Sequence, residues 1–213
     1  MAPVRLVIFD LDETLIDSRK AWAYTVEQAV LAVSGRHVDA SALVNEYRRR
    51  PWRHVFSVVA NDPTEAGRCE ETANEMFYRS GLKRLLVHDG VGMALDGLRA
   101  MRLEIGAISR EPHRRAIKQI ESTGLDRFLS VLSPTPDGDP WDVAARLAEC
   151  ISYLARQPQE AVYVSGESGC RQTAFDAGVR ALDVMWAAVD ERTGTGIATP
   201  AGLQAAIRLI AAR

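Results

Sequence analysis

The stretch Val4–Ser18, VRLVIFDLDETLIDS, decides the fold of this chain. Its first half is an apolar, β-branched run of the kind that forms a fully buried strand. The run ends in Asp10 and Asp12, so two carboxylates follow directly at the carboxyl end of the strand. Buried acids need a compensating cation, and ligands bind at the carboxyl ends of the strands in an open parallel sheet. We therefore expect a divalent metal and an anionic substrate at this point.

The second half of the chain alternates predicted strands and helices. Such alternation favours a doubly wound (Rossmann-like) α/β fold, with a parallel sheet of about five strands covered by helices on both faces. Hydrophobic runs and helix-boundary residues predict four further strands at 103–108, 128–132, 161–165 and 180–185, and helices at 89–100, 112–123, 140–154 and from Thr199-Pro200 onward.

Residues 19–85 have the periodicity of helices rather than of strands. Apolar residues from Trp22 to Val33 form one stripe of an amphipathic helix that ends near Gly35. Three more helices are predicted from Asp39, over 52–60 and over 64–80. The chain thus divides into an α/β core of residues 1–18 and 86–213 and an inserted four-helix domain of residues 19–85.

The spelling D-x-D-x-T at Asp10, Asp12 and Thr14 resembles the first motif of the haloacid dehalogenase-like (HAD) superfamily. By that resemblance, Asp10 is the nucleophile that forms an aspartyl-phosphate. Asp12 protonates the leaving group and later activates water, and Thr14 holds the turn and helps to bind phosphate. Four helices inserted directly after this motif resemble the helical cap of one HAD subclass, which implies a mobile lid; an ordinary helical subdomain without a gating role is the alternative.

Ser109 follows a short apolar strand and precedes Arg110 and a predicted helix. A hydroxyl group and main-chain amides at such a junction can hold phosphate oxygens, and an arginine can add charge. The position resembles the second HAD motif, so we expect Ser109 and Arg110 to bind phosphate, although a serine here could also be a simple helix cap.

The segment 162–178 resembles the fourth HAD motif, in which an apolar strand leads into acidic residues. Glu167 stands at the first acidic position. The resemblance implies that Asp10, Asp12 and Glu167 hold Mg²⁺, which prefers oxygen ligands. Arg171 stands at the second acidic position, where a guanidinium reduces the need for a cation.

The third HAD motif normally supplies a lysine beside the nucleophile, but this chain has none there. Residues 133–137 match the spelling of the motif and residues 139–142 match its location, and neither segment contains lysine. A cation from Arg171, Arg110 or Arg114 could take over the role. We expect Arg171 to do so as a catalytic residue, because its fork can bind carboxylate and phosphate together.

Composition excludes several functional classes. The chain has 213 residues, of which 47% are hydrophobic and 25% charged, and its net charge of -2 gives no electrostatic case for binding nucleic acid or an anionic membrane. The three cysteines form no C-x-x-C pair, which favours reduced thiols. With neither a signal peptide pattern nor a long apolar run, we expect a cytoplasmic protein.

These features together predict a HAD-like, Mg²⁺-dependent hydrolase that acts on a small phosphorylated metabolite through an aspartyl-phosphate, as a monomer or homodimer. Dehalogenation is less favoured, because Asp12 offers an acid and base that phosphoryl transfer needs. The alternative is a catalytically impaired HAD domain that binds a phosphorylated metabolite or a protein partner without turnover. The identity of the substrate is not encoded in any motif.

Overall fold

The computed structural model describes residues 2–48, 50–137, 139–167, 170–187 and 196–212. The chain divides into two compact units. One consists of residues 1–17 and 87–213, and the other of residues 18–86. The first contains the α/β sheet and the second consists of helices. That the helical unit acts as a cap stays a prediction.

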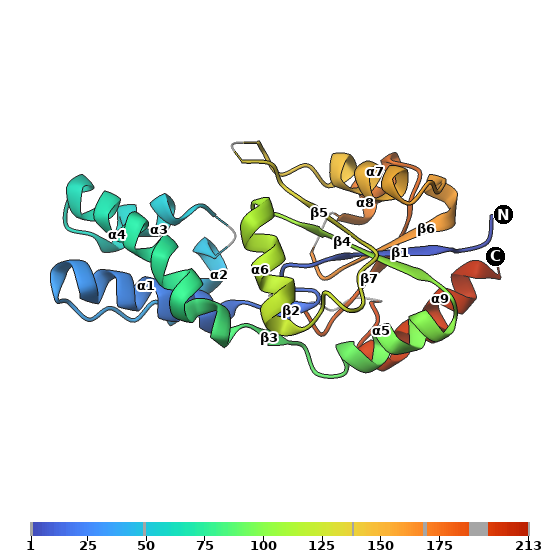
Figure 1. Ribbon diagram of the computed structural model, residues 1–213, viewed down its shortest axis with the longest axis horizontal. Helices are drawn as coiled ribbons and strands as arrows, with labels where there is room; N and C mark the ends of the chain where they lie inside the picture. Colours follow the sequence, from blue (N-terminus) through green and yellow to red (C-terminus); the bar gives the residue numbers. More distant parts are fainter. Residues whose placement is uncertain (1, 49, 138, 168–169, 188–195, 213) are drawn as a thin grey trace. The chain divides into compact units, whose positions relative to one another are not determined.

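The larger unit is built on a five-stranded parallel sheet, which confirms the predicted fold class. Its strand order is β5-β4-β1-β6-β7, so β1 lies at the centre (Figure 1). The strands are β1 (Leu6–Asp10), β4 (Glu104–Ser109), β5 (Val131–Pro134), β6 (Ala161–Ser165) and β7 (Arg180–Asp183). Every residue of β1 and β6 is buried, as their continuous apolar runs require in a sheet covered on both faces.

Helices cover both faces of this sheet. In Figure 1, α7 and α8 lie on one side and α5 and α9 on the other. Their bounds are α5 (Val91–Ala100), α7 (Val143–Tyr153), α8 (Cys170–Asp176) and α9 (Leu203–Ala211), while α6 (His113–Thr123) packs against the edge strand β5. Leu6 and Ile8 belong to the buried cluster beneath α7, and strand alternation turns Val7 and Phe9 to the opposite face.

The parallel register brings the carboxyl ends of the strands together at one edge. Asp10 pairs with Ile108, so Ser109 comes directly beyond it on the neighbouring strand. On the other side of β1, Ser165 ends β6 and pairs with Asp183 of β7. This edge therefore gathers the segments that the sequence predicts to carry the chemistry.

The unit of residues 18–86 has an aromatic core. Trp22 and Trp52 stack with ring centroids 6.0 Å apart, and Phe56 and Phe77 lie within 6.4 Å of Trp52. Its helices are α1 (Arg19–Ser34), α2 (Val44–Tyr47), α3 (Trp52–Val59) and α4 (Pro63–Met76), with shorter helical turns at Ser41–Leu43, Phe77–Gly81 and Leu82–Arg84. The predicted helical character is thus confirmed, with a much shorter second helix.

Several element boundaries differ from the sequence predictions. The third strand of the core lies at Val131–Pro134 rather than 128–132. Phe128 is instead buried in a turn, where its amide donates to the Leu125 carbonyl. Gly90, at φ 83°, and not Asp89, precedes helix α5. The structure also contains elements without a sequence prediction: helix α8 and two short paired strands, β2 (Ile16–Asp17) and β3 (Leu86–Val87).

Two of the cysteines are buried as free thiols, as the composition predicts. Cys150 lies in the buried cluster between α7 and the sheet, where its thiol donates to the Ala107 carbonyl at 3.6 Å. Burial raises the pKa of this thiol to about 12. Burial also raises the pKa of Cys69. Because the thiolate is the reactive form, both groups are poor nucleophiles in the folded protein.

We expect Cys69 and Cys150 to resist alkylation by iodoacetamide at pH 8 in the native protein and to react once the protein is unfolded in urea. With a pKa of about 12, roughly one Cys150 in 10⁴ is ionised at this pH. Peptide mapping by mass spectrometry measures each site, and a Cys170→Ser variant removes the third thiol as a control. Fast labelling of native Cys150 would contradict its placement in the core.

Candidate active site

A tight turn after β1 presents the two aspartates of the first motif. Asp10 is the last residue of the central strand and is 2% exposed. The Leu11 amide donates to the Ile108 carbonyl at 2.8 Å, and the Glu13 amide donates to the Ile16 carbonyl at 2.9 Å. The Glu13 backbone adopts φ 69°, a conformation that residues other than glycine rarely take outside tight turns. The turn therefore folds back at once and keeps Asp12 next to Asp10.

The second predicted motif binds the side chain of Asp12. Its Oδ2 accepts hydrogen bonds from the Ser109 hydroxyl at 2.8 Å and from the Arg110 amide at 2.9 Å. Both donors come from the end of β4, next to β1 in the sheet. These bonds fix the orientation of the Asp12 carboxylate. Phosphate binding by Ser109 and Arg110 stays a prediction.

The loop after β6 closes the other side of the site. Thr14 is buried, and its hydroxyl oxygen accepts a hydrogen bond from the Gly166 amide at 3.1 Å. A side chain at Gly166 would meet the Ala187 Cβ at 2.7 Å, so glycine is required by close packing. Ser165 lies beside Asp10, with a long hydroxyl–carboxylate contact of 3.4 Å. The Thr14 hydroxyl thus joins the turn after β1 to the loop after β6. A role of Thr14 in phosphate binding stays a prediction.

Arg110 is the cation that lies among the acids of the site. Its Nη2 forms an ion pair with Glu167 Oε2, and its guanidinium lies 4.7 Å from the ring centroid of Trp141. Burial opposes its charge, but the carboxylates of Glu167, Asp10 and Asp12 outweigh burial and raise the pKa of Arg110 above its ordinary value. The structure thus brings all three predicted metal-ligating residues near one guanidinium.

Arg171 pairs with a carboxylate outside this group, and its predicted catalytic role stays a prediction. Its Nε is 3.4 Å from Asp183 Oδ2 at the end of β7, and its side chain is 61% exposed. The physical reason is that Asp183 offers a carboxylate at the adjacent strand end, so Arg171 can pair there without being buried. Of the two arginines, Arg110 is the one that forms an ion pair with Glu167.

Two residues near the site had no role in the sequence prediction. Trp141 lies within the segment that matches the location of the third motif. An aromatic residue where the motif has lysine is the sequence feature that could have pointed to Trp141. Glu111 follows Arg110 and binds Arg115 at 3.0 Å. Burial raises the pKa of Glu111, with Arg115 opposing the rise, so this acid keeps its proton more readily than an exposed glutamate.

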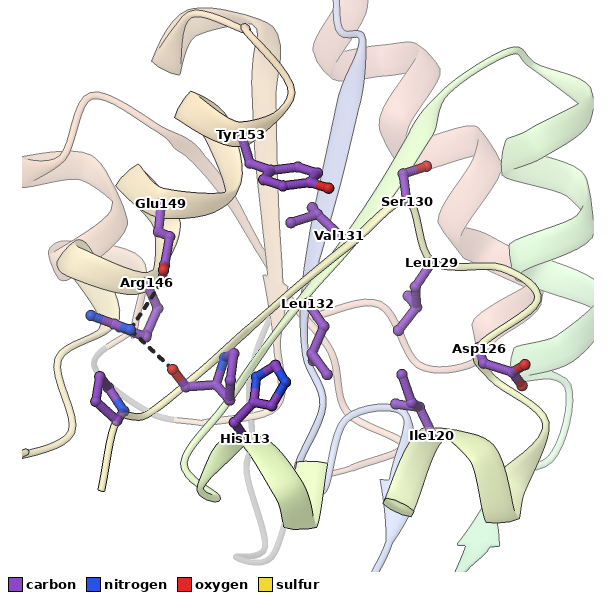
Figure 2. A pocket seen from close by; sticks show the side chains of 12 residues that line it. His113, Ile120, Asp126, Leu129, Ser130, Val131, Leu132, Arg146, Glu149 and Tyr153 are labelled. Atoms are coloured by element: carbon purple, nitrogen blue, oxygen red, sulfur yellow. Dashed lines mark hydrogen bonds and ion pairs between the residues drawn. The ribbon is translucent and has the colours of Figure 1, made fainter. Parts of the chain in front are cut away.

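A separate pocket of about 550 Å³ lies along the outer edge of β5, between α6 and α7 (Figure 2). His113, Arg146 and Tyr153 are among the side chains that line it, and Arg146 donates to the Pro134 carbonyl at 3.0 Å. None of the predicted site residues lines this pocket. It is therefore distinct from the acids at the end of β1.

The Thr14–Gly166 hydrogen bond predicts a stability difference between two substitutions. Thr14→Val leaves the buried Gly166 amide without its acceptor and should lower the free energy of unfolding by about 1–3 kcal/mol. Thr14→Ser keeps the hydroxyl and should cost less. Urea unfolding of both variants and the parent measures the effect; equal stability of the two variants would contradict this role of the hydroxyl.

Comparisons with known proteins place the fold. Comparison with the curated proteins finds no match. A HAD-superfamily hydrolase of subfamily IA, variant 1, from Geobacter sulfurreducens shares 17% identity over 96% of each chain, with a TM-score of 0.77. A predicted phosphatase from Clostridium acetobutylicum shares 17% identity over the whole of both chains (TM-score 0.75). The protein tyrosine kinase A of Mycobacterium tuberculosis shares 21% identity over 97% of this chain and 99% of its own (TM-score 0.74).

At these identities the solved structures show a shared fold alone. Among the described residues, no helix is long and apolar enough to cross a membrane. The haloacid dehalogenase-like hydrolase profile matches residues 7–184, a span that includes the turn after β1, the end of β4 and the loop after β6. The chain belongs to the haloacid dehalogenase-like hydrolase family.

Proposed function

We propose that this hydrolase cleaves small phosphate monoesters through an aspartyl-phosphate formed on Asp10. One observation carries the proposal: Asp10 ends the central strand and Asp12 follows in the turn, where Ser109 and Arg110 bind its carboxylate from the neighbouring strand. A pair of carboxylates held in this way suits a nucleophile and a separate acid and base. The phosphatases among the proteins that share the fold support the same reaction class.

In this mechanism a carboxylate oxygen of Asp10 attacks phosphorus, and the bond from phosphorus to the substrate's ester oxygen breaks. Asp12 donates a proton to that oxygen, so that the product leaves as an alcohol. Asp12 then takes a proton from water, whose oxygen attacks the aspartyl-phosphate and releases inorganic phosphate. The hydrogen bonds from Ser109 and the Arg110 amide keep Asp12 oriented through both steps.

Mg²⁺ is the cofactor that we assign to this site. The carboxylates of Asp10 and Glu167 and the main-chain carbonyl of Asp12 are oxygen ligands of the type that Mg²⁺ prefers. Within the described ranges no three His, Cys, Asp or Glu side chains cluster as a metal site, but this set needs only two carboxylates and a carbonyl. When bound, Mg²⁺ neutralises charge on the transferring phosphoryl group.

Replacement of the nucleophile tests the reaction. Asp10→Asn should lower hydrolysis of p-nitrophenyl phosphate by about 10³-fold or more, because an amide cannot form the acyl phosphate. Beryllofluoride, which mimics a phosphoryl group on aspartate, should bind the parent and not the variant.

Asp96→Asn makes the same chemical change at an exposed position of α5 and is the control. An Asp10→Asn variant as active as the parent would refute the covalent mechanism. A folded parent that hydrolyses no phosphate ester while binding phosphate would favour a domain without turnover.

Metal removal tests the cofactor. Chelation with EDTA followed by dialysis should lower activity by about a hundredfold, since a bound metal contributes several kcal/mol to stabilising the transition state. Added Mg²⁺ should restore it. Full activity in the chelated, dialysed protein would show that the acids at the end of β1 work without a divalent cation.

A further inference from the structure

The segment that should supply the third-motif lysine supplies a tryptophan instead. The three lysines of the chain are Lys20, Lys83 and Lys118, and none lies in residues 131–142. Trp141 occupies this segment, just before Asp142 caps helix α7. A positively charged side chain next to a transferring phosphoryl group would therefore have to come from another part of the chain.

Arg110 is held on two sides at the carboxyl edge of the sheet. Its Nη2 forms the ion pair with Glu167 Oε2, and its guanidinium lies 4.7 Å from the Trp141 ring centroid, within the range of a cation–π interaction. The side chain is 23% exposed, so it is shielded from solvent yet accessible. Two such contacts from different elements restrict a side chain that is otherwise highly flexible.

Both partners of Arg110 are themselves anchored. The Trp141 ring packs against the buried cluster beneath α7, which also contains Leu147 and Ile151. The Glu167 amide donates to the Ser165 hydroxyl at 3.0 Å, in the loop that follows β6. The guanidinium is therefore positioned by the core of the unit before any substrate arrives, as electrostatic catalysis requires.

We propose that Arg110 is the cation that receives the phosphate of the substrate, in place of the third-motif lysine, and that Trp141 is the positioning residue that holds it. The assignment rests on the proposed phosphate chemistry at Asp10. A guanidinium has five N–H donors, so it can bind Glu167 and a phosphate oxygen together. An arginine guanidinium stays charged in proteins, so this donor set keeps its positive charge.

Arg171 is the rival for this role, and the structure disfavours it. Its side chain is 61% exposed and pairs with Asp183, whereas Arg110 binds Asp12 through its amide and Glu167 through its guanidinium. An exposed guanidinium in water contributes far less to a phosphate site than a partly buried one.

Inorganic phosphate, the product common to all such reactions, is the probe. Its Kd is measured by calorimetry in Mg²⁺ buffer for the full chain and its variants. Arg110→Ala should weaken binding by about 10- to 100-fold, the usual effect of losing a hydrogen bond to a charged group. Trp141→Ala should weaken it roughly threefold to tenfold, and Trp141→Phe, which keeps an aromatic face, should restore most of the affinity.

Arg99→Ala, which removes an arginine from α5, is the matched control and should leave the Kd unchanged. If Arg110→Ala does not fold, Arg110→Gln, which keeps a hydrogen-bonding side chain without charge, replaces it. Unchanged affinity in the Arg110 variants, a loss in Arg171→Ala instead, or no phosphate binding by the parent would each overturn the assignment. Because binding is measured without turnover, failure here is distinguishable from failure of the Asp10 nucleophile.

Discussion

The position of a buried carboxylate, Asp10, and a half-buried one, Asp12, at the end of the central strand constrains the rest of this site. Asp10 is 2% exposed, and Asp12 follows it in a turn too tight to carry the acids away from the sheet. Charges in such a place are costly unless they are hydrogen-bonded or paired. The end of β4 meets this requirement at Asp12 with the Ser109 hydroxyl and the Arg110 amide, and the Ser165 hydroxyl at the end of β6 lies 3.4 Å from the Asp10 carboxylate.

This constraint connects the active site to the stability of the fold. Thr14 and Gly166 join the turn after β1 to the loop after β6, and the packing of Gly166 against Ala187 leaves no space for a side chain. The same loop carries Glu167, which binds Arg110. The residues that hold the backbone in place therefore also set the distances between the charged groups.

The segment of this chain at the third motif differs from the family pattern, because it contains no lysine. The segment at the third motif contributes an aromatic face, and the arginine that lies on that face belongs to the second motif. An arginine so placed can bind acid and phosphate through one planar fork, which a lysine cannot do. A missing motif residue is therefore weak support for loss of function, because a neighbouring strand can supply the same charge.

The parallel α/β fold, the helical character of residues 19–85 and the positions of Asp10, Asp12, Ser109 and Glu167 after strands could all be predicted from the amino-acid sequence. These features are local: buried strands have continuous apolar runs, and the residue after such a run lies at the edge of the sheet. The tertiary structure alone decided which arginine faces the acids. Arg110 and Arg171 both follow strands in the sequence, but the choice between them depends on Trp141 and Asp183, which lie far away along the chain and come close only when the sheet forms.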